Sequence, residues 1–252
     1  MEMNTMKNLT TKLLTLGLTA AMLTTCLTAC NTSKRGSDPA AGQNQTRQEQ
    51  EADPDMKNNV GSWAVPESSA VTEEHKKIFE NMKSQLDGFY YEPVAFLGSQ
   101  VVAGKNYCFL CKPMLESNGG LKSFTLVYIY VDLQGKASLL ANDRLVLPGT
   151  ENAGKEEPVP GGWSYAESAE ITDKIKQVMD KATETLTGET YEPVAYIGSQ
   201  VVSGTNHAIL CKATPSVKEL NGASKWVLVY VYENLDGKCE ITGTEDVTIA
   251  VK

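Results

Sequence analysis

The chain has 252 residues, of which 31 are acidic and 23 are basic, so its net charge is −8. This acidic balance, without a basic cluster, argues against nucleic acid as a partner. No stretch after residue 30 is long and apolar enough to cross a membrane.

The first thirty residues have the pattern of an export signal. Lys7 and Lys12 form a short positive start, and the apolar run at 13–23 that follows is too short to span a bilayer. The segment ends in Leu-Thr-Ala-Cys at residues 27–30. This ending resembles a bacterial lipoprotein signal.

The lipoprotein resemblance implies that residues 1–29 are removed and that Cys30 carries the lipid. An ordinary signal peptide cut near Ala29 is the alternative, and Cys26 is a weaker candidate for lipidation. Both interpretations place the mature protein outside the cytoplasm. The first places it at the bacterial cell envelope, attached to the membrane through the lipid alone.

Residues 30–59 consist almost entirely of polar and charged side chains. Such a segment buries too little apolar surface to offset the entropy of ordering it. We expect a disordered tether with a root-mean-square span of roughly 30 Å.

The rest of the chain is a tandem repeat. The segment Gln100-Val101-Val102-Ala103-Gly104 returns 100 residues later as Gln200-Val201-Val202-Ser203-Gly204. After Lys112 the second copy gains two residues, so that Tyr128 corresponds to Tyr230 at an offset of 102. We expect two domains, repeat 1 at 60–150 and repeat 2 at 160–252, each of an ordinary size for a small single-core domain.

Each repeat opens with a turn-rich lead and an apolar pattern of helical period. The pattern consists of Val71, Ile78, Phe79, Met82 and Leu86 in repeat 1, and of Ile171, Ile175, Val178, Met179, Ala182 and Leu186 in repeat 2. Thr72 and Thr172 are predicted to cap the helices, and Gly88 and Gly188 to end them.

Four strands are predicted after the helix of repeat 1, at Tyr91–Ser99, Lys105–Lys112, Lys122–Val131 and Lys136–Leu147. Short turns join them, and Gln100 to Gly104 forms the tip of the first hairpin. This order predicts an α+β unit, in which one helix packs on a face of one antiparallel sheet.

Several segments resemble the cystatin superfamily, the inhibitors of papain-like cysteine proteases. The two QVVAG and QVVSG segments look like its QxVxG signature, and Pro160-Gly161-Gly162-Trp163 is similar to the glycine-bearing trunk of the stefin branch. Val60-Gly61-Ser62-Trp63 is a looser version of this trunk. Leu133-Gln134-Gly135 and Leu235-Asp236-Gly237 fall where stefins carry a Leu-Pro-Gly turn. The resemblance implies two tandem cystatin-like units, each with one helix on a four- to five-stranded antiparallel sheet.

In a cystatin the trunk and two hairpin tips form one wedge, which fills the protease cleft without offering a scissile bond. The resemblance therefore implies a monomeric, reversible, tight-binding inhibitor of papain-like cysteine proteases. Glycine permits close backbone approach, and apolar side chains at a tip are costly in water unless a partner covers them. The predicted protease-binding residues are Gly61, Gln100, Val101, Val102, Ala103, Gly104, Leu133, Gly161, Gly162, Gln200, Val201, Val202, Ser203, Gly204 and Leu235.

An alternative function is a non-inhibitory binding or spacer module with the same fold on the cell surface. Two departures from the family pattern favour it: Gln134 and Asp236 stand where stefins place proline. Trp63 and Trp163 stand in the trunk, where a smaller aliphatic residue is usual. Each is either a binding anchor or a lid over the protein's own core.

Cys108 and Cys111 have CxxC spacing, but positions i and i+3 of a strand face opposite ways, so the two thiols share neither a metal nor an easy disulfide. We expect Cys111 and Cys211 to be buried thiols. A bridge from Cys108 to Cys239 would have to link the two domains and is not expected.

The two histidines, His75 and His207, do not recur at equivalent positions, and we expect both to be packing residues. A repeated nucleophile and base pair is therefore excluded. The sequence contains no phosphate-binding loop and no metal-ligand cluster, so we expect neither an enzyme nor a cofactor or metal.

Overall fold

The structure is a computed structural model, which describes residues 61–83, 86, 89–115, 119–120, 123–150, 161–216 and 223–251. The predicted signal peptide, Cys30, the tether and residues 151–160 lie outside the described residues. Residues Gln50–Lys252 form one compact unit that contains both repeats. No helix among the described residues has the length and hydropathy that crossing a bilayer requires.

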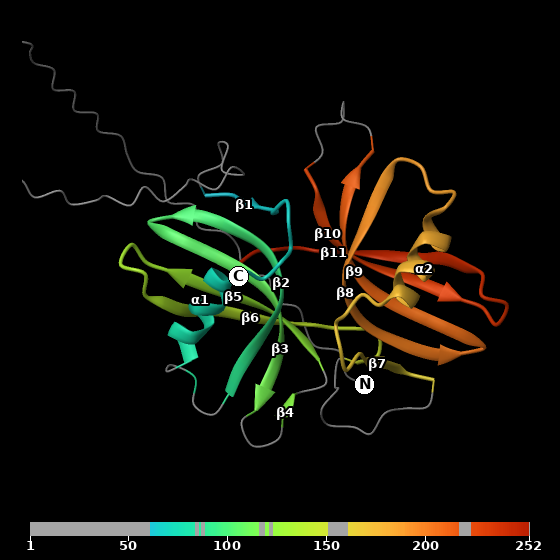
Figure 1. Ribbon diagram of the computed structural model, residues 1–252, viewed down its shortest axis with the longest axis horizontal. Coiled ribbons are helices and arrows are strands. Elements are labelled where there is room, and N and C mark those ends of the chain that lie inside the picture. The colour runs from blue at the N-terminus through green and yellow to red at the C-terminus, as the bar shows by residue number, and fades with distance from the viewer. Residues whose placement is uncertain are drawn as a thin grey trace, which may run out of the picture. The chain divides into compact units, whose positions relative to one another are not determined.

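The two repeats build equivalent antiparallel sheets (Figure 1). Repeat 1 runs β1 (Trp63–Ala64), α1 (Glu73–Lys83), β2 (Phe89–Val102), β3 (Gly104–Leu115), β4 (Gly119–Gly120), β5 (Phe124–Val131) and β6 (Ala137–Leu145). Repeat 2 runs β7 (Trp163–Tyr165), α2 (Asp173–Thr183), β8 (Glu189–Val202), β9 (Gly204–Pro215), β10 (Lys225–Glu233) and β11 (Cys239–Val247). The strand orders are β1-β2-β3-β5-β6, with β4 paired to β3, and β11-β10-β9-β8-β7.

The predicted fold class, an α+β protein of two tandem helix-on-sheet cystatin-like units, is wrong. The described chain is mostly β, with two helices of 11 residues each and two sheets of five strands along their main paths. Strands β2 and β8 extend for 14 residues, through positions that the sequence assigns to a hairpin tip. The helices end early, so that Leu86 and Leu186 lie beyond them.

The sheets are apolar on both faces, which explains the error. Every side chain of Cys108–Cys111 and of Phe124–Ile129 is buried, whichever face of the sheet it occupies. On one face, Ile78, Phe79 and Met82 of α1 pack into a cluster with sheet residues of repeat 1. The opposite face needs another cover, because one short helix covers only one side of a sheet.

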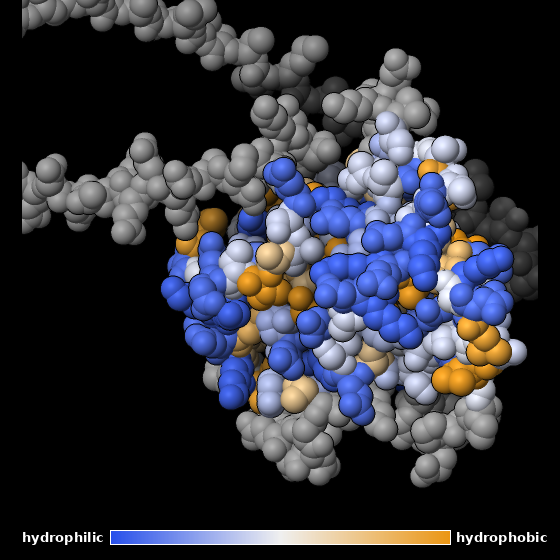
Figure 2. All heavy atoms as spheres, turned by 45° about the vertical axis from the view of Figure 1, so that its right-hand side comes forward, coloured by the Kyte–Doolittle hydropathy of each residue, from blue (hydrophilic) through white to orange (hydrophobic). Residues whose placement is uncertain are grey.

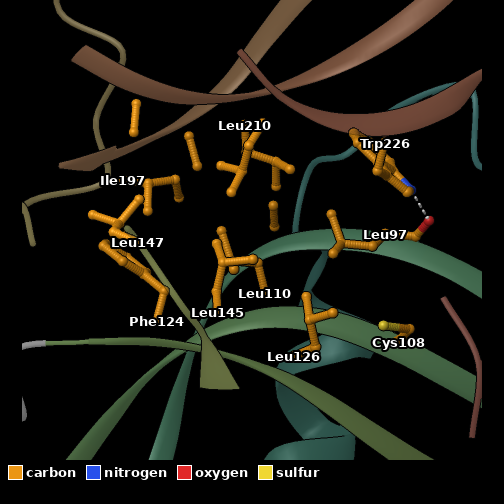
Figure 3. Packing of buried hydrophobic residues seen from close by; sticks show 14 of the residues in the cluster. Leu97, Cys108, Leu110, Phe124, Leu126, Leu145, Leu147, Ile197, Leu210 and Trp226 are labelled. Carbon is orange, nitrogen blue, oxygen red and sulfur yellow. Dashed lines mark hydrogen bonds between the residues drawn. The ribbon is translucent and has the colours of Figure 1, made fainter. Parts of the chain in front are cut away.

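The other repeat supplies that cover. A single buried cluster draws side chains from both sheets, and Figure 3 shows them meeting between the two layers. Trp226 is 1% exposed and donates a hydrogen bond from its indole nitrogen to the Leu97 carbonyl, at 2.6 Å. The main members of this shared core are Leu97, Cys108, Leu110, Phe124, Leu126, Tyr128, Leu145, Leu147, Ile197, Leu210, Trp226 and Leu228.

Reciprocal contacts make the arrangement nearly two-fold symmetric. The residues that follow β6 and β11 cross to the other repeat. Leu147, after β6, packs on Gly198, where an added Cβ atom would lie 2.7 Å from a leucine methyl group. Ile249, after β11, packs on Gly98 in the same way, with a distance of 3.3 Å. Lys112 donates to the Glu167 carbonyl, and Lys212 to the Pro66 carbonyl. The two copies therefore pack as the partners of a two-fold dimer do, although one chain supplies both.

Several local predictions are confirmed. The Ile175 amide donates to the Thr172 hydroxyl and the His75 amide to the Thr72 hydroxyl, which are the expected helix caps. Gly88 lies outside the described residues.

The cysteines also follow the strand parity. Cys108 lies in the shared core and Cys111 in the cluster below α1, on opposite faces of the sheet. Cys111 and Cys211 are fully buried, and burial raises the pKa of both thiols. Cys108 and Cys239 are both free.

Candidate functional site

Three segments meet at one end of the sheet of repeat 1. Val102 pairs with Gly104 to close the β2–β3 hairpin, and Lys105 pairs with Val131 directly before the β5–β6 turn. The Gly61 amide donates to the Val101 carbonyl at 3.1 Å, which attaches the lead to the first hairpin. We call Gly61, Val101–Gly104 and Leu133–Gly135 together wedge 1.

Repeat 2 brings the equivalent segments together. Val202 pairs with Gly204, Thr205 pairs with Glu233 at the end of β10, and Trp163 of the lead pairs with Gln200. We call Gly161–Gly162, Val201–Gly204 and Leu235–Gly237 together wedge 2. The predicted protease-binding residues of each repeat thus lie at one end of one sheet.

The glutamine of each QxVxG segment is an internal brace. The Gln100 side chain donates to the Gly61 carbonyl and accepts from the Asn106 side chain, both at 2.7 Å. Gln200 does the same with Gly161 and Asn206, at 2.8 and 2.7 Å. The amide of this glutamine is therefore already bonded within the protein, where it ties the lead to the first hairpin.

The two asparagines are not among the site residues predicted from the sequence, although both copies contain one. Asn106 and Asn206 each stand six residues after the bracing glutamine in both copies. A polar residue that is kept at the same strand position in two copies indicates a specific hydrogen bond.

The first tip of each repeat needs glycine because the neighbouring strand leaves no room for a side chain. Gly104 has φ 122°, and a Cβ there would lie 2.5 Å from the Val131 carbonyl oxygen and 2.7 Å from the Tyr130 ring. Gly204 has φ 124° and the equivalent contacts. A side chain at either position would push β5 or β10 away, so the fold itself requires glycine here.

Two tyrosines hold the first tips in place. The Tyr130 hydroxyl donates to the Ala103 carbonyl, and the Tyr232 hydroxyl donates to the Ser203 carbonyl. Each bond spans from the strand before the second tip to the turn residue of the first tip. Neither tyrosine is among the site residues predicted from the sequence, although the two correspond at the offset of 102.

The second tips, which lack the proline of stefins, form a hydrogen-bonded turn. The Asp132 carboxylate accepts from the amides of Gln134 and Lys136, both at 2.9 Å. In repeat 2 Asn234 accepts in the same way from the amides of Asp236 and Lys238. Proline has no amide hydrogen, so it would remove the first of these bonds.

The wedges carry much of the exposed apolar surface. Nine large apolar side chains are exposed among the described residues, and five of them belong to the wedges. The five are Val102 at 40%, Leu133 at 79%, Val201 at 71%, Val202 at 44% and Leu235 at 84% exposure. Figure 2, which brings repeat 2 forward, shows small apolar patches on a largely hydrophilic face.

The two tryptophans cover the protein's own core. Trp63 and Trp163 are partly buried and pack against the shared core. Their rings meet those of Tyr128 and Tyr230 edge to face, with centroids 5.8 and 5.5 Å apart. Of the two alternatives drawn from the sequence, this geometry favours lids over binding anchors.

Only repeat 2 has a buried histidine among the described residues, and it contacts the end of β10 next to wedge 2. His207 is 3% exposed, with Nδ1 3.1 Å from the Tyr196 hydroxyl and Nε2 3.2 Å from the Glu233 carboxylate. Lys174 lies 3.4 Å from the same carboxylate. Burial lowers the pKa of His207, against the opposing effect of Glu233. Burial alone would raise the pKa of Glu233, but the hydrogen bond with His207 and the charge of Lys174 lower it.

Repeat 1 has no equivalent of this cluster at the corresponding positions, where Tyr107, Phe96 and Val131 stand in place of His207, Tyr196 and Glu233. His75 packs instead on the Phe96 ring at 4.4 Å. Across the part of the chain that the structure describes, no group of three or more His, Cys, Asp or Glu side chains is arranged to hold a metal.

Comparison of the sequence with family models and with curated proteins gives no relative. No protein-family model matches the chain, and no curated protein matches it at a significant level of similarity.

Proposed function

We propose that the chain is a reversible, tight-binding inhibitor of papain-like cysteine proteases, in which a wedge fills the active-site cleft of the enzyme. The observation that carries the proposal is the meeting of a glycine-bearing lead and two apolar tips at one end of each sheet. The resemblance of the QVVAG and QVVSG segments to the QxVxG signature indicates the class of enzyme.

The energetics support a protein partner for the wedges. Leu133 and Leu235 are about four-fifths exposed, and covering such a side chain contributes roughly 2 kcal/mol. The bracing glutamines, the two tyrosines and the Asp132 and Asn234 turns hold the tips in one conformation before binding. Little conformational entropy then remains to be lost on association.

The proposed setting is the bacterial cell envelope. Cys30 would carry the lipid, and the polar segment 30–59 would hold the inhibitor clear of the membrane surface. In this setting the inhibitor meets proteases that arrive from outside the cell or act within the envelope.

The test is the titration of papain with residues 31–252 and with two variants. One variant carries Leu133→Asp and Leu235→Asp, so that both wedges are changed in the same chain. The matched control carries Leu140→Asp and Leu186→Asp, at exposed leucines outside the wedges. We expect wild type to slow papain at micromolar concentration, the wedge variant to bind at least about 30-fold more weakly, and the control to match wild type.

Papain activity that is unchanged at micromolar wild-type chain would overturn inhibition. It would favour a non-inhibitory binding or spacer module on the cell surface. Equal weakening by the wedge and control variants would also contradict the proposal, because it would place the contact elsewhere.

A further inference from the structure

The two wedges lie at opposite ends of the compact unit that contains both repeats. In Figure 1 the hairpin tips of repeat 1 lie at the left and those of repeat 2 at the right. The contacts between the repeats agree with this view. Trp226 and Lys212, at the ends of β10 and β9 that are far from wedge 2, are the residues that bond to Leu97 and Pro66 of repeat 1.

The shared core fixes this arrangement and leaves both wedges open. None of the wedge residues belongs to the shared core, which is built from the middle and far ends of the strands. The strand path from Val102 to Leu97 and from Trp226 to Leu235 spans at most roughly 45 Å at 3.3 Å per residue. A globular protease of ordinary size has a diameter of about the same length.

We propose that one chain binds two papain-like proteases at the same time, one at each end. This inference rests on the proposed function, and adds to it a stoichiometry of one chain to two enzymes. Buried contacts between the two sheets hold the wedges apart. Two enzymes bound in this way face away from each other and do not compete for space.

The experiment is an active-site titration of papain, combined with the mass of the complex from light scattering after gel filtration. Four proteins spanning residues 31–252 are compared. They are wild type, a wedge 1 variant with Val102→Asp and Leu133→Asp, a wedge 2 variant with Val202→Asp and Leu235→Asp, and the control with Leu140→Asp and Leu186→Asp. All changed residues are exposed, and thermal unfolding verifies that each variant is folded.

Wild type and control are expected to titrate two papain molecules per chain, and each wedge variant only one. The mass of the wild-type complex should exceed that of either wedge variant by one papain. A wild-type endpoint of one papain per chain, with complete inhibition, would overturn bivalent binding and leave the inhibitory function standing. A wedge variant that retains two equivalents, or one that loses both, would overturn it as well. Absence of inhibition at every ratio would overturn the proposed function itself.

Discussion

At the scale of single residues, His207 couples the stability of the folded protein to pH. Burial lowers its pKa below 6.5, so the folded protein favours the neutral imidazole. The stabilisation is complete above pH 6.5 and is lost as pH falls toward the lower pKa of the folded state, because the unfolded chain takes up a proton first. The pKa of Glu233 is lowered from 4.5, so its contribution to stability is complete above pH 4.5 and is lost only in more acidic solution.

We therefore expect the free energy of unfolding to decrease as pH falls below 6.5, and to decrease less in a His207→Gln variant. Urea denaturation at a series of pH values measures this difference. The other histidine, His75, is present in both proteins and serves as an internal control. Parallel pH profiles for wild type and variant would contradict a role of His207 in the pH response.

At the scale of elements, the tyrosine bonds predict how much tip order contributes to binding. Tyr130→Phe and Tyr232→Phe in one chain remove the two hydroxyls that hold the Ala103 and Ser203 carbonyls. One hydrogen bond contributes about 0.5–1.5 kcal/mol, so each wedge should bind papain about 2- to 12-fold more weakly. Inhibition constants measure the effect.

The matched control is Tyr230→Phe, which removes a hydroxyl that bonds Glu245 at 3.1 Å, outside the wedges. Its inhibition constant should remain that of wild type. If the double tyrosine variant inhibits as strongly as the control, the tips do not depend on these bonds for their order.

Element prediction from the sequence succeeded where periodicity and repetition are strong. The caps Thr72 and Thr172 and the sequential order of the strands follow from local pattern, which two copies reinforce. The braces were missed because side-chain bonds between segments leave little trace in one sequence. Gln100 contacts Gly61 across 39 positions, and only the copy at Gln200 indicates that the pair matters.

At the scale of the whole molecule, the predicted fold class is wrong because the central strands carry apolar side chains on both faces of the sheet. Cys108-Phe109-Leu110-Cys111 shows no polar face, which is typical of a strand that is covered twice. The predicted unit has a helix on one face of the sheet and no partner on the other. The partner is the sheet of the other repeat, a contact between residues more than 100 positions apart, such as Trp226 and Leu97.

The shared core predicts that the two repeats unfold together. Trp226→Ala removes a side chain that is 1% exposed and its hydrogen bond to Leu97, which should cost about 3–5 kcal/mol. Because Trp226 packs on both sheets, hydrogen exchange should accelerate in β3 and β5 of repeat 1 as well as in β9 and β10. Mass spectrometry of peptides from each strand measures this, with Leu186→Ala, at an exposed position, as the unchanged control. Acceleration confined to repeat 2 would show instead that each sheet is stable without the other, and the fixed separation of the two wedges would then lose its physical basis.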